Sequence, residues 1–107
     1  MGGSCKTEIR KGYPFLSNNE PLTLRAKRFA AEYLGEDNVV DLPMRMTAED
    51  FAWYSQQMPA CFYRLGTGNA GKGIASPVHT STFDVDEDCL ATGMGLMSWI
   101  ALMELAE

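Results

Sequence analysis

The sequence predicts a mixed α/β fold with about three helices and two to three short strands. Apolar residues recur at helical spacing from Leu22 to Leu34, residues 61–65 form a short aromatic run closed by glycine, and residues 89–103 carry no charge. The first pattern is typical of an amphipathic helix and the second of a strand. The third is typical of a helix that is covered on all sides.

The first helix is expected to begin at Asn19 or Glu20, because Pro21 then falls in the first turn, where its missing N–H leaves no hydrogen bond unmade. Gly35 is placed to end it. One face of this helix is apolar and should pack on the core. That face consists of Leu22, Ala26, Phe29, Ala30, Tyr33 and Leu34.

A second helix is predicted from a capping pattern in which Thr47 is followed three residues later by Asp50. It should end near Gln57, before Pro59. Glu49 and Asp50 place negative charge at its N-terminus, where the helix dipole favours it. Helix capping accounts for both acids, and the alternative is a position beside a metal ligand or facing a substrate.

The third helix is expected to start at the acidic residues 86–88 and to continue through the uncharged residues 89–103. That uncharged segment is shorter than the roughly 20 residues that span a bilayer, so no membrane association is predicted. The other elements offer too little surface to cover it. We therefore expect further protein to pack here, either another chain or a missing part of this one, and we expect a homo-oligomer, such as a dimer, through this helix.

Three segments are strand candidates. Residues 5–10 alternate weakly between polar and apolar, residues 39–42 are bounded by Asn38 and Pro43, and residues 61–65 are the most strand-like because they are aromatic and end at glycine.

Composition excludes several classes of function. The chain has 107 residues, 46% of them hydrophobic and 21% charged, which is typical of one small globular domain. A net charge of −5 with scattered basic residues argues against a nucleic-acid surface. Cys5, Cys61 and Cys89 have no metal-binding or disulfide spacing, so a reducing cytoplasm is the expected location.

Two further sequence patterns resemble ligand-binding loops, but the neighbouring residues do not suit either function. Residues 66–73 match a glycine-rich phosphate loop, but Pro77 follows closely and disfavours the helix whose N-terminus such a loop requires. These residues are expected to be a mobile loop instead. Residues 84–88 resemble the start of a calcium loop, but Cys89 stands at its glycine position and Gly95 at its glutamate position.

His79 is the only histidine in the chain. A lone histidine is usually an ordinary loop or core residue. Here a loop position before an acid-capped helix favours a metal role, because a neutral imidazole suits a divalent transition metal and neighbouring hydroxyls can orient its second nitrogen. A catalytic metal needs at least three protein ligands, so His79 would be one part of a larger site.

Four segments in order resemble the C-terminal end of a known family. They are residues 12–14 (GYP), residues 46–52 (MTAEDFA), Leu65-Gly66 and residues 79–87 (HTSTFDVDE). The family is that of the binuclear-metal amidohydrolases and metallopeptidases, which includes N-acyl amino acid amidohydrolases, hippurate hydrolases and auxin-conjugate hydrolases.

The resemblance implies that residues 1–12 are the end of a lid or dimerisation domain, or an artificial scar. It implies that residues 13–107 are the C-terminal portion of the catalytic domain and contribute to its sheet. His79 matches the family's last metal-binding histidine, and Gly66 and Gly68 match a stretch that borders the substrate pocket. Two divalent metals (zinc, manganese, cobalt or nickel) are expected in the complete enzyme, and weak or no metal binding in this chain alone.

The predicted function is therefore that of a C-terminal segment of a metal-dependent amidohydrolase or peptidase acting on N-acyl amino acids or small peptides. The chain has no Glu-Glu pair and no second histidine, which the family supplies upstream. No catalytic residue is therefore assigned within it, and alone it should be inactive. The alternatives are a non-catalytic interaction or oligomerisation module derived from the family, and one subunit of a split enzyme.

Overall fold

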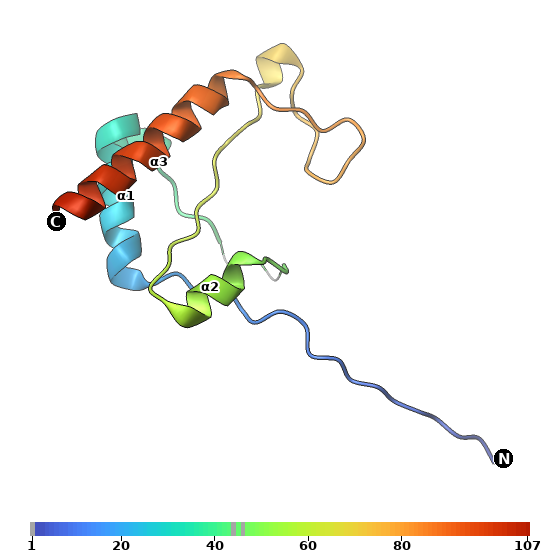
Figure 1. Ribbon diagram of the computed structural model, residues 1–107. Coiled ribbons are helices and arrows are strands. Elements are labelled where there is room, and N and C mark those ends of the chain that lie inside the picture. The colour runs from blue at the N-terminus through green and yellow to red at the C-terminus, as the bar shows by residue number, and fades with distance from the viewer. Residues whose placement is uncertain (1, 44, 46) are drawn as a thin grey trace.

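The computed structural model describes residues 2–43, 45 and 47–107, so Met1 of the first segment and Met46 of the resembling motif lie outside the described residues. Figure 1 shows two long helices that meet, a short helix set apart from them and an N-terminal segment that runs away from the body. The helices are α1 (Glu20–Leu34), α2 (Phe51–Gln57) and α3 (Asp88–Ala106), and the short 3-10 turns are η1 (Glu36–Asn38) and η2 (Ala70–Lys72). The three predicted helices are confirmed, although α2 and α3 begin later than predicted.

The predicted α/β class is wrong, because the described residues form no strand and no sheet. Their single β-bridge is isolated and joins Asn69 to Ile74. Residues 5–10, 39–42 and 61–65, all predicted as strands, belong to no element. A strand is held by hydrogen bonds to a neighbouring strand, and none of the three is paired with another segment in this way. Their composition suits a strand, but no ladder forms.

Residues 60–62 are held by a side chain in place of a strand. The Nδ2 of Asn18 donates to the carbonyl oxygen of Phe62 at 2.9 Å, and the Oδ1 of Asn18 accepts from the Phe62 amide at 2.8 Å. The Asn19 amide donates to the carbonyl of Ala60 at 2.9 Å. One carboxamide thus satisfies both backbone groups of Phe62 and fastens this segment to the start of α1.

Asn18→Ala is expected to lower the free energy of unfolding by about 1–2 kcal/mol, because it removes two hydrogen bonds whose partners remain accessible to water. Urea unfolding followed by far-UV circular dichroism measures the change. The matched control is Ser17→Ala at the neighbouring exposed position, which should stay within about 0.5 kcal/mol of the parent. Equal unfolding free energies for the two variants would contradict the fastening role.

Helix α1 begins and ends as predicted. The side chain of Asn19 caps it by accepting from the Leu22 amide at 3.1 Å. Gly35 ends it with a φ of 91°, a conformation that glycine adopts at little cost, and its amide donates to Ala31 at 2.8 Å. The predicted apolar face is buried only at its centre, at Ala26, Phe29 and Ala30.

Helix α2 begins at Phe51, later than predicted, and the expected capping box does not form. Thr47 lies outside the helix, and the side chain of Asp50 makes no capping hydrogen bond. The carboxylate of Glu49 instead accepts from the Phe51 amide at 3.3 Å. The end at Gln57 agrees with the prediction.

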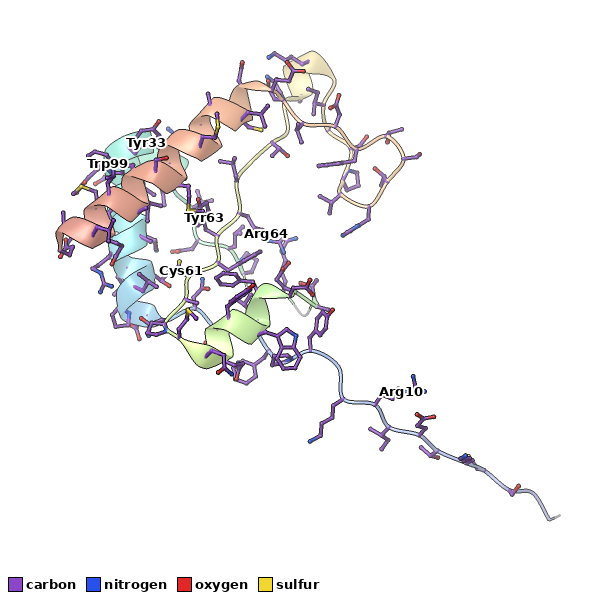
Figure 2. The ribbon with its side chains drawn as sticks, viewed as in Figure 1. Arg10, Tyr33, Cys61, Tyr63, Arg64 and Trp99 are labelled. Atoms are coloured by element: carbon purple, nitrogen blue, oxygen red, sulfur yellow. The ribbon has the colours of Figure 1, made fainter. Side chains whose placement is uncertain are left out.

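Helix α3 packs against α1. The rings of Tyr33 and Trp99 stack where the two helices meet, with centroids 6.4 Å apart and planes inclined by 27° (Figure 2). At the other end of the contact, Arg25 donates to both carboxylate oxygens of Glu104, at 2.8 and 3.1 Å. An aromatic stack and a bidentate ion pair therefore fix the helix pair at two places.

Among the described residues, α3 is the one helix long and apolar enough to cross a membrane by length and composition. The uncharged segment 89–103 lies within this longer helix of 19 residues, and the absence of membrane association stays a prediction. A single helix of this kind is weak evidence for a membrane, since core helices of soluble proteins have the same length and composition. Only 6% of its apolar window is buried within the chain.

The chain leaves much of its surface open. Its accessible surface is 8995 Å², whereas a folded monomer of this mass exposes about 5,900 Å². Its radius of gyration is 18.8 Å, against about 13 Å for a compact domain of this length. The apolar residues of α3 account for part of the excess, since five of them are more than half exposed. These are Leu90, Met94, Met97, Leu102 and Leu105.

Candidate functional site

His79 lies in an exposed turn of the loop that leads from η2 into α3. In Figure 1 this loop projects away from the helices. The backbone of His79 has a φ of 64°, which makes it the one non-glycine residue with positive φ in the described part of the chain. A ring buried in apolar packing would have excluded a metal ligand. The exposed ring does not, and the ligand role stays a prediction.

The hydroxyls expected to orient the imidazole bond elsewhere. The Thr80 hydroxyl donates to the carbonyl of Pro77 at 2.7 Å, and the Thr82 hydroxyl donates to the Ser76 hydroxyl at 2.8 Å. The Phe83 amide also donates to the carbonyl of Thr80 at 3.2 Å. These bonds close the turn around His79, and none of them involves the imidazole.

At the other end of the loop, the Asp86 carboxylate accepts several hydrogen bonds. Its Oδ2 accepts from the Asn69 carboxamide at 2.7 Å, and its Oδ1 accepts from the Lys72 ammonium at 2.9 Å and from the Asp88 amide at 3.2 Å. These contacts, led by the one from Asn69, lower the pKa of the Asp86 carboxyl to about 2. The side chain is 14% exposed, whereas that of Asp88 is 87% exposed. Asp86 is therefore held far more firmly than its acidic neighbour.

The sequence patterns missed this network. They assigned Asp86, together with residues 87 and 88, to the start of a helix, whereas α3 begins only at Asp88. Asn69 and Lys72 stand in a glycine-rich run that was expected to be a mobile loop, yet they make these hydrogen bonds. No local pattern relates side chains so far apart in sequence. The asparagine within the glycine run was the one available signal.

The two glycines predicted to border a substrate pocket have different surroundings. Gly66 lines a groove of about 400 Å³. The other walls of this groove come from the C-terminal half of α1, the segment that follows it, residues 63–65 and Leu96 of α3. Gly68 is not among the residues that line this groove, and a Cβ there would lie 3.3 Å from the carbonyl oxygen of Ile74. Gly68 therefore permits a close backbone approach, and the predicted substrate role of both residues is untested.

The glycine-rich run does not open an α-helix, so its geometry differs from that of a phosphate loop. The amides of Asn69 and Ile74 donate to each other's carbonyl oxygens at 2.7 and 2.9 Å. Between them lies only the turn η2, which ends at Gly73 with a φ of 74°. Residues 69–74 thus form a closed turn in which the amides of Asn69, Lys72, Gly73 and Ile74 donate within the turn.

Glu49 and Asp50 lie at the start of α2. Glu49 accepts the hydrogen bond from Phe51 described above, and the Asp50 carboxylate raises the pKa of the Tyr13 phenol through a hydrogen bond and its charge. Tyr13 also meets Trp53 edge to face, with ring centroids 6.2 Å apart. These contacts connect α2 with the N-terminal segment. A further role for Glu49 or Asp50 beside a metal or a substrate stays a prediction.

The described residues do not fit a metal ion by themselves. No group of three or more histidine, cysteine, aspartate or glutamate side chains comes together among them. The three cysteines are free thiols. An exposed imidazole is nevertheless a suitable single donor for a divalent transition metal, so His79 fits the role of one ligand among several supplied from elsewhere.

Comparison with known proteins identifies relatives. The chain is 35% identical to an IAA-amino acid hydrolase ILR1-like 6 of Arabidopsis thaliana, covering 83% of the chain and 19% of that protein. It is 31% identical to a probable hydrolase of Synechocystis sp., covering 94% and 26%. It is 33% identical to thermostable carboxypeptidase 2 of Saccharolobus solfataricus, covering 86% and 23%. The chain thus spans about a quarter or less of these relatives. No solved structure matches significantly.

The family model described as peptidase family M20/M25/M40 matches residues 3–102, which is nearly the whole chain. This confirms the resemblance drawn from the four sequence segments, and the relatives named as hydrolases and carboxypeptidases agree with it. The chain belongs to peptidase family M20/M25/M40, a family of generally metal-dependent hydrolases.

Proposed function

We propose that this chain is the C-terminal segment of a metal-dependent amidohydrolase or peptidase that cleaves the amide bond of N-acyl amino acids or small peptides. The observation that carries the proposal is the family match over residues 3–102. The names of the relatives support the substrate class, because an IAA-amino acid hydrolase and a carboxypeptidase both release an amino acid from an amide.

His79 is proposed to supply one metal ligand through a ring nitrogen. Its exposure in a projecting loop supports this role, since a second protein surface can reach it. A bound divalent metal (zinc, manganese, cobalt or nickel) polarises a carbonyl and lowers the pKa of water. The chain's own contribution is to present the imidazole, with its turn closed by the Thr80 and Thr82 hydroxyls.

The remaining ligands are proposed to lie on protein that covers α3. Its exposed residues Leu90, Met94 and Met97 lie on one face, because they recur three and four positions apart. Leu102 and Leu105 extend that apolar surface. Burying it stabilises an assembly by roughly 25 cal/mol per Å² of apolar area removed from water. The same face supports the alternative of a non-catalytic module, with a second copy as the partner.

The test is carried out on the protein that contains this chain, loaded with Zn²⁺, Mn²⁺ or Co²⁺ and offered a panel of N-acyl amino acids. His79→Ala is expected to lower the metal content and to reduce kcat/KM by at least about 100-fold, since even groups that only orient a ligand cost 10- to 100-fold. The matched control is Val78→Ala, because Val78 is the neighbouring exposed residue in the same turn. This variant should retain the metal content and the kcat/KM of the parent.

Amino-acid release and metal content distinguish the outcomes. Activity and metal content that survive His79→Ala would refute the ligand role while leaving the hydrolase assignment in place. An assembled protein that takes up no metal and releases no amino acid from any substrate would refute the hydrolase assignment and favour the interaction module.

A further inference from the structure

A closed turn and a carboxylate form a clasp at the base of the His79 loop. The turn is residues 69–74, in which Asn69 and Ile74 exchange both backbone hydrogen bonds. The carboxylate is that of Asp86, immediately before α3. Because Asn69 and Lys72 both donate to Asp86, at 2.7 and 2.9 Å, the turn is tied to the start of the helix.

The backbone reinforces the clasp. The Asp86 amide donates to the carbonyl of Thr67 at 2.8 Å, so residues on both sides of the turn are fixed to the same point. Asp86 also accepts from the Asp88 amide at 3.2 Å, which connects its carboxylate to the first turn of α3. Asp86 therefore uses its amide and both carboxylate oxygens at once.

The clasp defines the loop that carries His79. Residues 75–85 leave the turn at one end and return to Asp86 at the other, and they are mostly exposed. Within this loop only short-range hydrogen bonds hold the turn at His79. Fixing both ends of an exposed loop removes much of the conformational freedom that it would otherwise have.

We propose that Asp86 is the positioning residue for His79, acting through Asn69 and Lys72. A metal ligand must be held in place before the metal binds, because ordering the loop on binding would lower the affinity. Most of the loop makes no buried contact, so the clasp is the feature that supplies this order. The inference rests on the proposed metal role of His79, and it adds residues that do not touch the metal.

The experiment compares Asp86→Ala with Asp88→Ala in the protein that contains this chain. Asp88 is the matched control because it is also acidic and also contacts Lys72, at 3.3 Å, but it is 87% exposed and none of its hydrogen bonds involves Asn69. A third variant exchanges the partners, Asn69→Asp with Asp86→Asn, so that a carboxamide and a carboxylate still face each other.

Two measurements distinguish the effect of each variant on the order of the loop from its effect on metal binding. In the metal-free protein, amide hydrogen exchange at Asn69 and Ile74 reports whether the turn is held. With Co²⁺, the visible absorption spectrum and the dissociation constant report whether His79 reaches the metal. Asp86→Ala is expected to speed the exchange and to weaken Co²⁺ binding on the order of 10-fold, with a spectrum that moves toward that of His79→Ala.

The control variants show which outcomes support the positioning role of Asp86 and which overturn it. Asp88→Ala should change neither exchange nor spectrum, and the exchanged pair should recover most of both. If Asp86→Ala leaves Co²⁺ binding at the parent value while His79→Ala abolishes it, the positioning role is overturned. An exchanged pair that stays as loose as Asp86→Ala also counts against it. If His79→Ala has no effect on Co²⁺ at all, the ligand proposal fails, and the exchange measurement alone decides whether Asp86 holds the turn.

Discussion

Phe29→Ala is expected to separate α1 from α3. Phe29 is 1% exposed and is the largest fully buried side chain among the described residues. Truncating such a phenylalanine costs about 3–5 kcal/mol, since the transfer free energy is lost and a cavity remains. Ordinary domains have only about 5–15 kcal/mol of stability, and this chain buries less surface than they do. The loss is therefore comparable with all the stability of the helix pair.

The stack of Tyr33 on Trp99 provides the measurement for Phe29→Ala. Near-UV circular dichroism and tryptophan fluorescence should lose the signal of a packed indole, while far-UV circular dichroism shows a smaller loss of helix. The matched control is Phe15→Ala, because Phe15 is 75% exposed and its truncation should change stability by less than about 0.5 kcal/mol. A Phe29→Ala protein with an unchanged near-UV spectrum would show that the contact does not depend on this ring.

The helices were predictable because their signals are local. Asn19, Pro21 and Gly35 mark the ends of α1 within a few residues of where the backbone needs them. The start of α2 was misplaced because the predicted capping pair of Thr47 and Asp50 does not form. The Thr47–Asp50 pattern satisfies the rule in sequence, but Glu49 makes the contact with the Phe51 amide. Capping patterns locate a helix more reliably than they locate its first residue.

The strands were not predictable for the opposite reason. Residues 61–65 have strand composition, but a strand needs a partner with free backbone groups, and composition carries no information about the partner. Here the Asn18 carboxamide takes that place for Phe62. The exposure of His79 and the clasp at Asp86 were also beyond the sequence. A carboxylate that accepts hydrogen bonds from Asn69 and Lys72 depends on how the turn folds, which spacing alone does not specify.

Gly95→Ala is expected to destabilise the helix pair, although alanine is the better helix former. A Cβ at position 95 would lie 1.9 Å from the hydroxyl oxygen of Tyr33 and 2.8 Å from its Cζ. Tyr33 would have to swing away from Trp99, which loses a stack worth about 0.5–1.5 kcal/mol. Overpacking of this kind costs about 1–3 kcal/mol, and the gain in helix propensity is about 1 kcal/mol. The cost is therefore larger than the gain.

A double-mutant cycle with Tyr33→Ala isolates this clash, because without the ring Gly95→Ala has only its helix propensity to contribute. The substitution should then stabilise the protein by about 1 kcal/mol, so its sign reverses between the two backgrounds. Gly93→Ala is the control, since its Cβ would meet only the Cδ2 of Leu65, at 2.8 Å. That methyl group ends a flexible side chain on a segment outside any helix and can move aside. Urea unfolding of the four combinations measures the coupling, and equal effects of Gly95→Ala with and without Tyr33 would mean that the two helices approach each other differently at this position.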